Sequence, residues 1–152
     1  MSDSFDPGVV RQLDRPPTAI DHPPMAIQLD FILPYPPDAV WAVVGDPART
    51  DWVPGVESCE FAGGVRRFRL AGAGQLAERI LLRDPGQRRL EYAVIESSPS
   101  LESHFAAIQI DSHASGALLR WETRVEPQAV EPFIRRNMEA AIAELKRILQ
   151  LG

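Results

Sequence analysis

The sequence has little of several features that define whole classes of protein. It contains a single cysteine, Cys59, so no intrachain disulfide framework and no cluster of thiolate ligands is available to it. No apolar run is long enough to cross a bilayer, and the start of the chain lacks the basic and then apolar pattern of a signal peptide. We therefore expect a cytoplasmic protein with no membrane insertion and no metal site.

Positive charge is also scarce. Sixteen Lys and Arg residues stand against 21 Asp and Glu, giving a formal net charge of −5, and the basic residues are scattered rather than gathered. A nucleic-acid partner is not expected, because phosphate binding needs a concentrated basic surface. The "GAG" at 72–74 lies between predicted strands rather than before a helix, so it is no dinucleotide fingerprint and no cofactor is expected.

Proline is concentrated at one end of the chain. The first 25 residues contain five prolines, few apolar residues and no periodicity, which predicts an extended arm (1–25) preceding one domain (26–152). Such an arm is either loose or docked along its own domain or a neighbouring subunit, through Val9, Val10, Leu13 and Ile20. A homodimer formed through the arm is one of these alternatives.

The domain begins with a strand and two short helices. In "AIQLDFIL" (26–33), apolar residues alternate with Gln28 and Asp30, which predicts a strand with one buried face. "DAVWAVVGD" (38–46) predicts a short helix that ends at Asp46-Pro47, and "ARTDWV" (48–53) predicts a second helical turn or two before Pro54-Gly55.

A run of strands and one long helix follow. Turn-forming residues separate six predicted strands, at 56–62, 65–71, 75–83, 88–96, 102–112 and 117–126. From Val130 onward, apolar residues recur at three- and four-residue steps, which predicts an amphipathic helix. The predicted class is α+β: a curved antiparallel sheet of seven strands wrapped around a long C-terminal helix, with two short helices between the first and second strands.

Several local phrases carry a family resemblance. "VWAVVGD" (40–46), "DWVPGVESCE" (51–60), "AERILLRD" (77–84), "LEYAVI" (90–95) and "LLRWETRVEP" (118–127) resemble the START/Bet v 1-like (SRPBCC) superfamily, and within it the polyketide cyclase/dehydrase-like group. The resemblance runs from Ala26 to the C-terminus and implies a helix-grip fold around a ligand cavity. It implies no fixed catalytic motif.

Strand alternation indicates which polar residues face inward. Glu78 shares a face with Leu76, Ile80 and Leu82, whereas Arg79 and Arg83 are expected in solvent. Tyr92, His104 and Thr123 fall on apolar faces in the same way. Each also has a plainer interpretation: Glu78 pairs with Arg66 or another arginine, His104 bonds near the sheet margin, and Tyr92 and Thr123 pack in the core.

These positions, with large apolar residues, define the expected ligand site. Trp41 and Trp52 stand eleven positions apart and are either core residues or walls of a cavity. The predicted ligand-binding residues share an expected inward side chain: Trp41, Trp52, Glu78, Ile80, Tyr92, His104, Ala106, Trp121, Thr123, Phe133 and Met138. Gly63-Gly64 and Gly72-Ala73-Gly74 are expected as hairpin tips around the entrance.

Three functions remain open. The first is binding of a hydrophobic small molecule (lipid-, aromatic- or polyketide-like) in the cavity. The second is a cyclase/dehydratase-type enzyme, with His104 as base, Glu78 as its orienting partner or as the acid, and Tyr92 as oxyanion donor. The third is a protein-partner role through the acidic surface or the arm.

Overall fold

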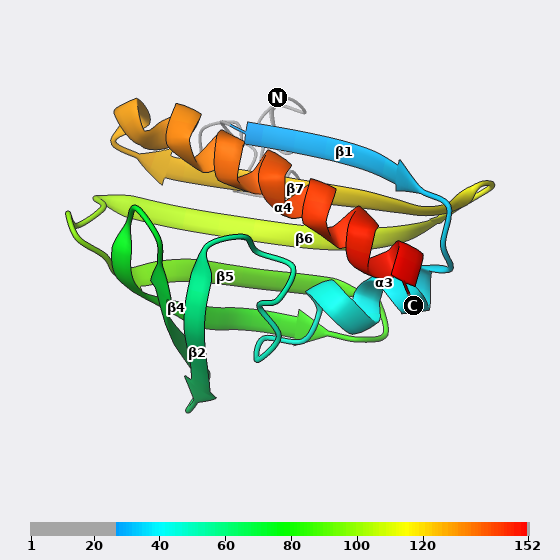
Figure 1. The fold of residues 1–152 in the computed structure, drawn as a ribbon, viewed down its shortest axis with the longest axis horizontal. Helices are drawn as coiled ribbons and strands as arrows, with labels where there is room; N and C mark the ends of the chain where they lie inside the picture. Colours follow the sequence, from blue (N-terminus) through cyan, green and yellow to red (C-terminus); the bar gives the residue numbers. More distant parts are fainter. Residues whose placement is uncertain (1–26, 152) are drawn as a thin grey trace, which may run out of the picture.

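Seven strands and two α-helices make up residues 27–151, the part of the chain that this computed structural model describes (Figure 1). The predicted arm and the homodimer expected through it lie outside the described residues and stay predictions. The elements in chain order are β1 (Ile27–Leu33), α3 (Pro37–Val44), β2 (Val56–Ala62), β3 (Val65–Leu70), β4 (Gly74–Asp84), β5 (Arg89–Glu96), β6 (Ser103–His113), β7 (Gly116–Glu126), the 3₁₀ turn η1 (Gln128–Val130) and α4 (Glu131–Leu151).

All seven strands form one sheet in the order β1-β7-β6-β5-β4-β3-β2. Every neighbouring pair is antiparallel, and each strand from β3 to β7 returns beside the one before it through a short connection. Strand β1 closes the other edge against β7. The predicted strands and the long C-terminal helix are confirmed, with boundaries that differ by one or two residues at most.

The predicted second short helix is wrong. Between α3 and β2 the chain makes isolated turns: Arg49 N–H bonds to Asp46 O at 3.0 Å and Val53 N–H bonds to Thr50 O at 3.0 Å. Pro47 and Pro54 bracket only six residues, too few to propagate a helix once nucleated, and Pro54 also disfavours helical geometry at Val53.

A β-bulge in β4 overturns a second expectation. Ile80 pairs with Tyr92 but Leu82 pairs with Glu91, so Leu81 is an extra residue and the strand changes face beyond it. Leu82 is consequently exposed rather than inward. Arg83 is exposed, as predicted, and it also reaches the end of helix α3, where its Nε donates to Gly45 O at 2.6 Å.

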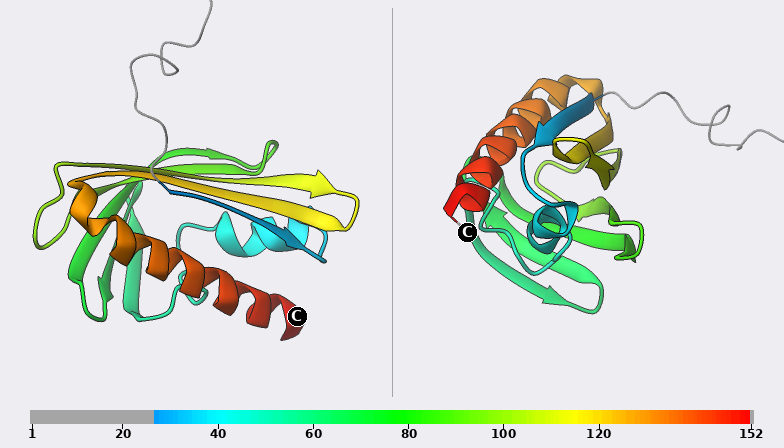
Figure 2. Two further views of the ribbon diagram at one scale, coloured as in Figure 1. Left: turned by 90° about the horizontal axis from the view of Figure 1, so that it is seen from above. Right: turned by 90° about the vertical axis from the view of Figure 1, so that its right-hand side faces the viewer.

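Helix α3 fills one end of the space enclosed by the curved sheet. Figure 2 shows it between the strands and the C-terminal half of α4. Its apolar side chains are buried there with those of α4, β1, β6 and β7, and the fully buried ones include Leu33, Val40, Ile110, Leu119 and Leu145. We call this region the closed end.

Among residues 27–151, no helix lies between the sheet and α4 at the other end. There the N-terminal half of α4 faces the inner sides of β2, β3 and β4, which curve toward it (Figures 1 and 2). We call this region the open end. The strong twist of a seven-stranded antiparallel sheet brings its far edge round to face the helix.

Candidate functional site

The open end contains a cavity of about 380 Å³. Its size lies within the range of roughly 300–1,000 Å³ that small-molecule sites occupy. Apolar side chains predominate, and the lining residues come from every layer of the open end: Arg49, Trp52, Val53, Val56, Arg66, Phe68, Leu70, Gly72, Ala73, Leu76, Glu78, Tyr92, Val94, Ser97, Ser98, Pro99, Leu101, His104, Trp121, Thr123, Val130, Phe133, Ile134, Asn137 and Met138.

A buried ion pair forms one wall of this cavity. Arg66 on β3 and Glu78 on β4 are direct cross-strand partners, and Arg66 Nε donates to Glu78 Oε1 at 2.6 Å. The two residues are only 7% and 9% exposed. Burial disfavours the charged guanidinium and is the largest single influence on its pKa. The charge of Glu78, its hydrogen bond and the nearby Tyr92 and Cys59 together outweigh burial, so the pKa of Arg66 is raised. Glu78 is thus paired with Arg66 and also lines the cavity, so the ion pair and the place at the cavity, which the sequence analysis gave as alternatives, occur together.

Two aromatic residues connect this wall to the far side of the sheet. Trp121 Nε1 on β7 donates to the Tyr92 hydroxyl oxygen on β5 at 3.1 Å, and the Arg66 guanidinium lies 4.9 Å from the centre of the Tyr92 ring. Burial, with the charge of Glu78, raises the pKa of Tyr92, so its hydroxyl stays protonated. Among residues 27–151 that hydroxyl has no acceptor, which leaves its proton for a guest.

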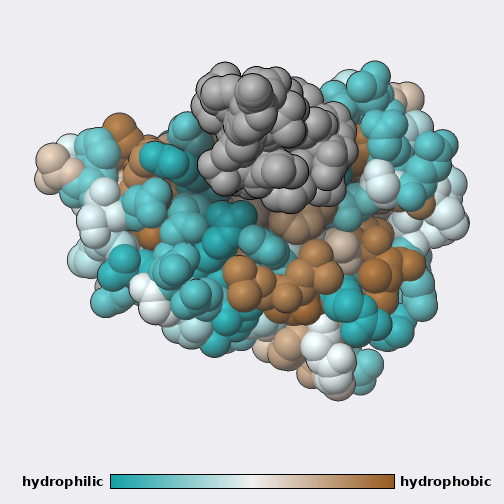
Figure 3. Space-filling model, turned by 180° about the vertical axis from the view of Figure 1, so that it is seen from behind, coloured by the Kyte–Doolittle hydropathy of each residue, from teal (hydrophilic) through white to brown (hydrophobic). Residues whose placement is uncertain are grey.

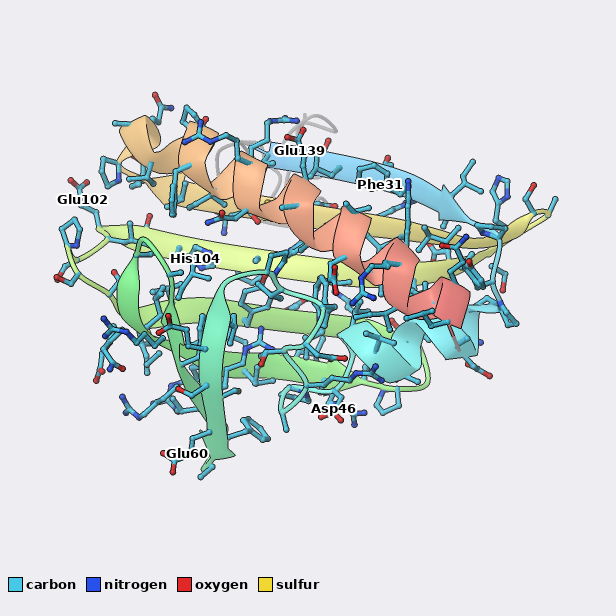
Figure 4. All side chains as sticks on the ribbon, viewed as in Figure 1. Phe31, Asp46, Glu60, Glu102, His104 and Glu139 are labelled. Atoms are coloured by element: carbon cyan, nitrogen blue, oxygen red, sulfur yellow. The ribbon has the colours of Figure 1, made fainter. Side chains whose placement is uncertain are left out.

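His104 lies where strands β5 and β6 separate. Their paired register ends at Tyr92 and Ala106, and beyond it the Val94 backbone N–H donates to His104 Nδ1 at 3.1 Å instead of to a strand carbonyl. Nδ1 therefore accepts, and the proton of the neutral ring is on Nε2. Burial lowers the pKa of His104 to about 4, which keeps the ring neutral. Figure 4 shows His104 on β6, between the N-terminal half of α4 and strands β2 to β4.

Helix α4 supplies the opposite wall. Thr123 on β7 donates its hydroxyl to Met138 Sδ at 3.4 Å, which holds the helix against the sheet at the inner limit of the cavity. The neighbouring Asn137 also lines the space, as do Phe133 and Ile134 about one turn earlier, and the Phe133 side chain is partly exposed. An apolar, half-exposed residue of this kind marks where the cavity meets solvent.

The structure brings most of the predicted site residues together. Those that line the cavity are Trp52, Glu78, Tyr92, His104, Trp121, Thr123, Phe133 and Met138. Trp52 packs against Trp121 with ring centres 5.3 Å apart, so the two indoles form one continuous surface.

Three of the predicted ligand-binding residues do not line the cavity: Trp41, Ile80 and Ala106. Trp41 is in the closed end, packed so tightly on Gly45 that a Cβ there would overlap its ring. Ala106 is flanked in register by Tyr92 and Thr123, whose larger side chains cover it. Ile80 packs against the core next to the bulge.

Other lining residues were missed by the sequence analysis. Arg66 and Phe68 alternate with the exposed Arg67 and Arg69 along "VRRFRL". The alternation is hard to recognise in the sequence because one of the two buried residues, Arg66, is itself charged. Leu101 and Ser97 belong to the β5–β6 connection, whose course no periodicity predicts. Asn137 is the polar member of an otherwise apolar helix face.

Only one of the two predicted glycine tips borders the cavity. Gly72 and Ala73, in the β3–β4 turn, line it. Gly63 and Gly64 are in the β2–β3 turn and contribute nothing to the lining, although Gly64 O accepts the backbone N–H of Ile80. The β3–β4 turn, the β5–β6 connection and the start of α4 thus all contribute to the cavity lining.

Neither a metal site nor a membrane span is found in the part of the chain that is described. Within residues 27–151, no three His, Cys, Asp or Glu side chains gather as metal ligands, and neither helix is long and apolar enough to cross a bilayer. The face seen from behind mixes hydrophilic with hydrophobic groups (Figure 3), and the exposed apolar residues of β4 and β5 include Leu81, Leu82 and Ile95.

A curved antiparallel sheet that holds a long C-terminal helix over an apolar cavity defines the helix-grip class of proteins. The chain belongs to the polyketide cyclase / dehydrase and lipid transport family, which it matches over residues 26–150, within the START/Bet v 1-like superfamily. No curated protein matches the sequence.

Solved structures share the fold at low sequence identity. The protein XoxI from Bacillus cereus is 17% identical with a TM-score of 0.73, over 82% of this chain and 94% of that one. Protein CV1439 from Chromobacterium violaceum is 23% identical with a TM-score of 0.63, over 83% of this chain and 98% of that one. Ara h 8.0201 is 13% identical with a TM-score of 0.67, over 83% and 97%.

Proposed function

We propose that the protein binds a hydrophobic small molecule, lipid-, aromatic- or polyketide-like, in the cavity of its open end. The observation that carries this proposal is the cavity itself: about 380 Å³, largely apolar, enclosed between the sheet and α4, and bordered by a partly exposed Phe133. A tightly packed domain contains few voids larger than a water molecule, so a space of this size needs an explanation. The family, described as polyketide cyclase / dehydrase and lipid transport, supports the same proposal.

The donors inside the cavity favour a guest that carries at least one hydrogen-bond acceptor. The Tyr92 hydroxyl and the His104 Nε2–H have no acceptor among the described residues, and both groups belong to side chains of the lining. A buried donor without a partner costs roughly 1–3 kcal/mol, which a suitable guest would recover. An otherwise apolar molecule with one polar end fits both the walls and the donors.

Two measurements test the binding proposal. Native mass spectrometry of the purified protein should detect a co-purifying apolar molecule, or one taken up from an added mixture. Val94→Trp, which adds bulk to the cavity wall, should then abolish uptake. Ile95→Trp is the matched control, because Ile95 is the next residue on β5 and is exposed outside the cavity. Equal uptake by both variants, each shown to be folded, would contradict binding at this site.

An acid–base enzyme of the cyclase/dehydratase type is the second candidate, since Glu78, Tyr92 and His104 line one cavity. His104 is poorly suited to be its base, because Nδ1 already accepts a backbone N–H and Nε2 carries the proton. Glu78 retains carboxylate lone pairs beyond the one bonded to Arg66, so it is the better candidate base. With a suitable polyketide-like substrate, loss of turnover in Glu78→Gln alone would support this assignment.

A further inference from the structure

Each charged side chain of the cavity wall is paired with an opposite charge of the protein itself. Of the described residues that line the cavity, three are charged: Arg49, Arg66 and Glu78. Arg49 is partly exposed and is paired with Asp51 at 2.8 Å. Arg66 is paired with Glu78 at 2.6 Å, and both are buried. The wall therefore presents a guest with no uncompensated charge.

A carboxylate guest would meet this pair unfavourably. It could approach the Arg66 guanidinium only beside Glu78, whose own carboxylate is 2.6 Å from the same group. Like charges repel strongly where water is excluded, and displacing Glu78 would leave that charge buried without a partner. A neutral acceptor such as an amide, ester or ketone meets no such repulsion and still bonds to the neutral donors of Tyr92 and His104.

We propose that Glu78 is a specificity-determining residue that makes the cavity accept neutral, acceptor-bearing apolar molecules and reject the corresponding carboxylates. This inference rests on the proposed binding function and narrows its ligand class. It assigns Glu78 a role distinct from stability: the carboxylate neutralises an arginine that would otherwise recruit anions. Because an arginine remains charged in any protein setting, removing the Glu78 charge alone should expose that cation to the guest.

Decanamide and decanoate form a matched pair of probes, since they share one chain and differ mainly in charge at about pH 8. Binding is measured by calorimetry, with tryptophan fluorescence as a second signal because Trp52 and Trp121 line the cavity. Wild-type protein should bind decanamide at least about tenfold more tightly than decanoate. Decanoate should bind Glu78→Gln at least about tenfold more tightly than it binds wild-type protein. A gain of this size corresponds to about one charge-assisted hydrogen bond.

Two further variants separate the effect of the cavity from that of overall charge. Glu96→Gln removes the same charge from an exposed pair, Glu96 with Arg67 at 2.8 Å, and should leave both affinities unchanged. The double variant Arg66→Gln/Glu78→Gln leaves no charge on this wall and should lose the gain in decanoate affinity. A gain that persists in the double variant would overturn the assignment to Arg66.

The outcomes distinguish failure of the inference from failure of the binding function. If wild-type protein binds both probes equally, or if Glu78→Gln leaves the preference unaltered, the inference is overturned and binding stands. If neither probe binds wild-type protein or any variant, both the proposed binding function and the inference are contradicted. Should Glu78→Gln not fold, the two probes in wild-type protein still decide, because equal affinities for decanamide and decanoate overturn the inference.

Discussion

The two ends of the molecule are built on the same sheet and the same helix, yet one is solid and the other hollow. At the closed end α3 occupies the space between the strands and α4, and aliphatic side chains such as Leu145 and Ile142 are fully buried. At the open end no element of the described part of the chain fills that space, and charged or polar side chains such as Arg66, Glu78 and Thr123 are buried instead.

This difference indicates that the closed end contributes more to the stability of the fold than the open end does. Aliphatic burial at the closed end supplies roughly 25 cal/mol per Å² of apolar surface removed from water. A buried ion pair supplies little net stability, because desolvation of both charges offsets their attraction. The closed end therefore holds sheet and helix together, which leaves the open end free to keep a cavity and polar groups that suit a guest.

Breaking the buried pair should have the largest effect. Arg66→Met leaves Glu78 buried without its partner and should lower the free energy of unfolding by about 3–5 kcal/mol, as judged by urea denaturation. Arg67→Met is the matched control, since Arg67 pairs with exposed Glu96 and should cost less than about 1 kcal/mol. Replacing both buried partners, as Arg66→Met/Glu78→Leu, should recover most of the loss. Equal costs for Arg66 and Arg67 would contradict the comparison.

The next prediction compares one residue type along one helix. Ile142, in the closed-end half of α4, is 2% exposed, whereas Ile134 in the other half lines the cavity. Ile142→Ala should reduce the free energy of unfolding by about 2–5 kcal/mol, because it opens a void among close-packed neighbours. Ile134→Ala only enlarges an existing space and should cost about 1 kcal/mol. The distinction between the ends is lost if the two substitutions cost the same in parallel denaturation curves.

The sequence predicted the strands and the long helix better than it predicted the walls of the cavity. Alternation alone placed Glu78, Tyr92 and Thr123 on the inner face, and all three are buried. It failed beyond Leu81, since a bulge reverses the alternation without leaving a mark in the residue types. The segment between Pro47 and Pro54 was likewise mispredicted, because its isolated turns have a local sequence that resembles a short helix.

Trp41 and Trp52 show the same limit of local sequence patterns. Trp52 lines the cavity and Trp41 does not, although both precede turn-forming residues. What separates them is the orientation of α3, fixed by packing of Val40 and Val44 in the closed end and by the bond from Arg83 to Gly45. Long-range packing of this kind is absent from local sequence patterns.

The last prediction concerns pH and tests whether the wall of the open end is dry. Burial lowers the pKa of His104 from 6.5 to about 4. Above pH 6.5 the ring is neutral in both folded and unfolded protein, so its contribution to stability is fully present. Between pH 6.5 and about 4 the unfolded chain binds a proton that the folded protein refuses, and stability should fall by up to about 1.4 kcal/mol per pH unit.

His104→Asn removes this titration, and its amide oxygen has the means to accept the Val94 N–H in place of Nδ1. Urea denaturation of both proteins across this pH range, with the His104→Asn curve subtracted, cancels the carboxylates common to both. The difference should decline steadily below pH 6.5. His113→Asn is the matched control, because His113 is exposed and should leave the wild-type curve unchanged. A flat difference for His104→Asn would mean that water reaches the ring and holds its pKa near the ordinary value, so that the open end is wet as well as hollow.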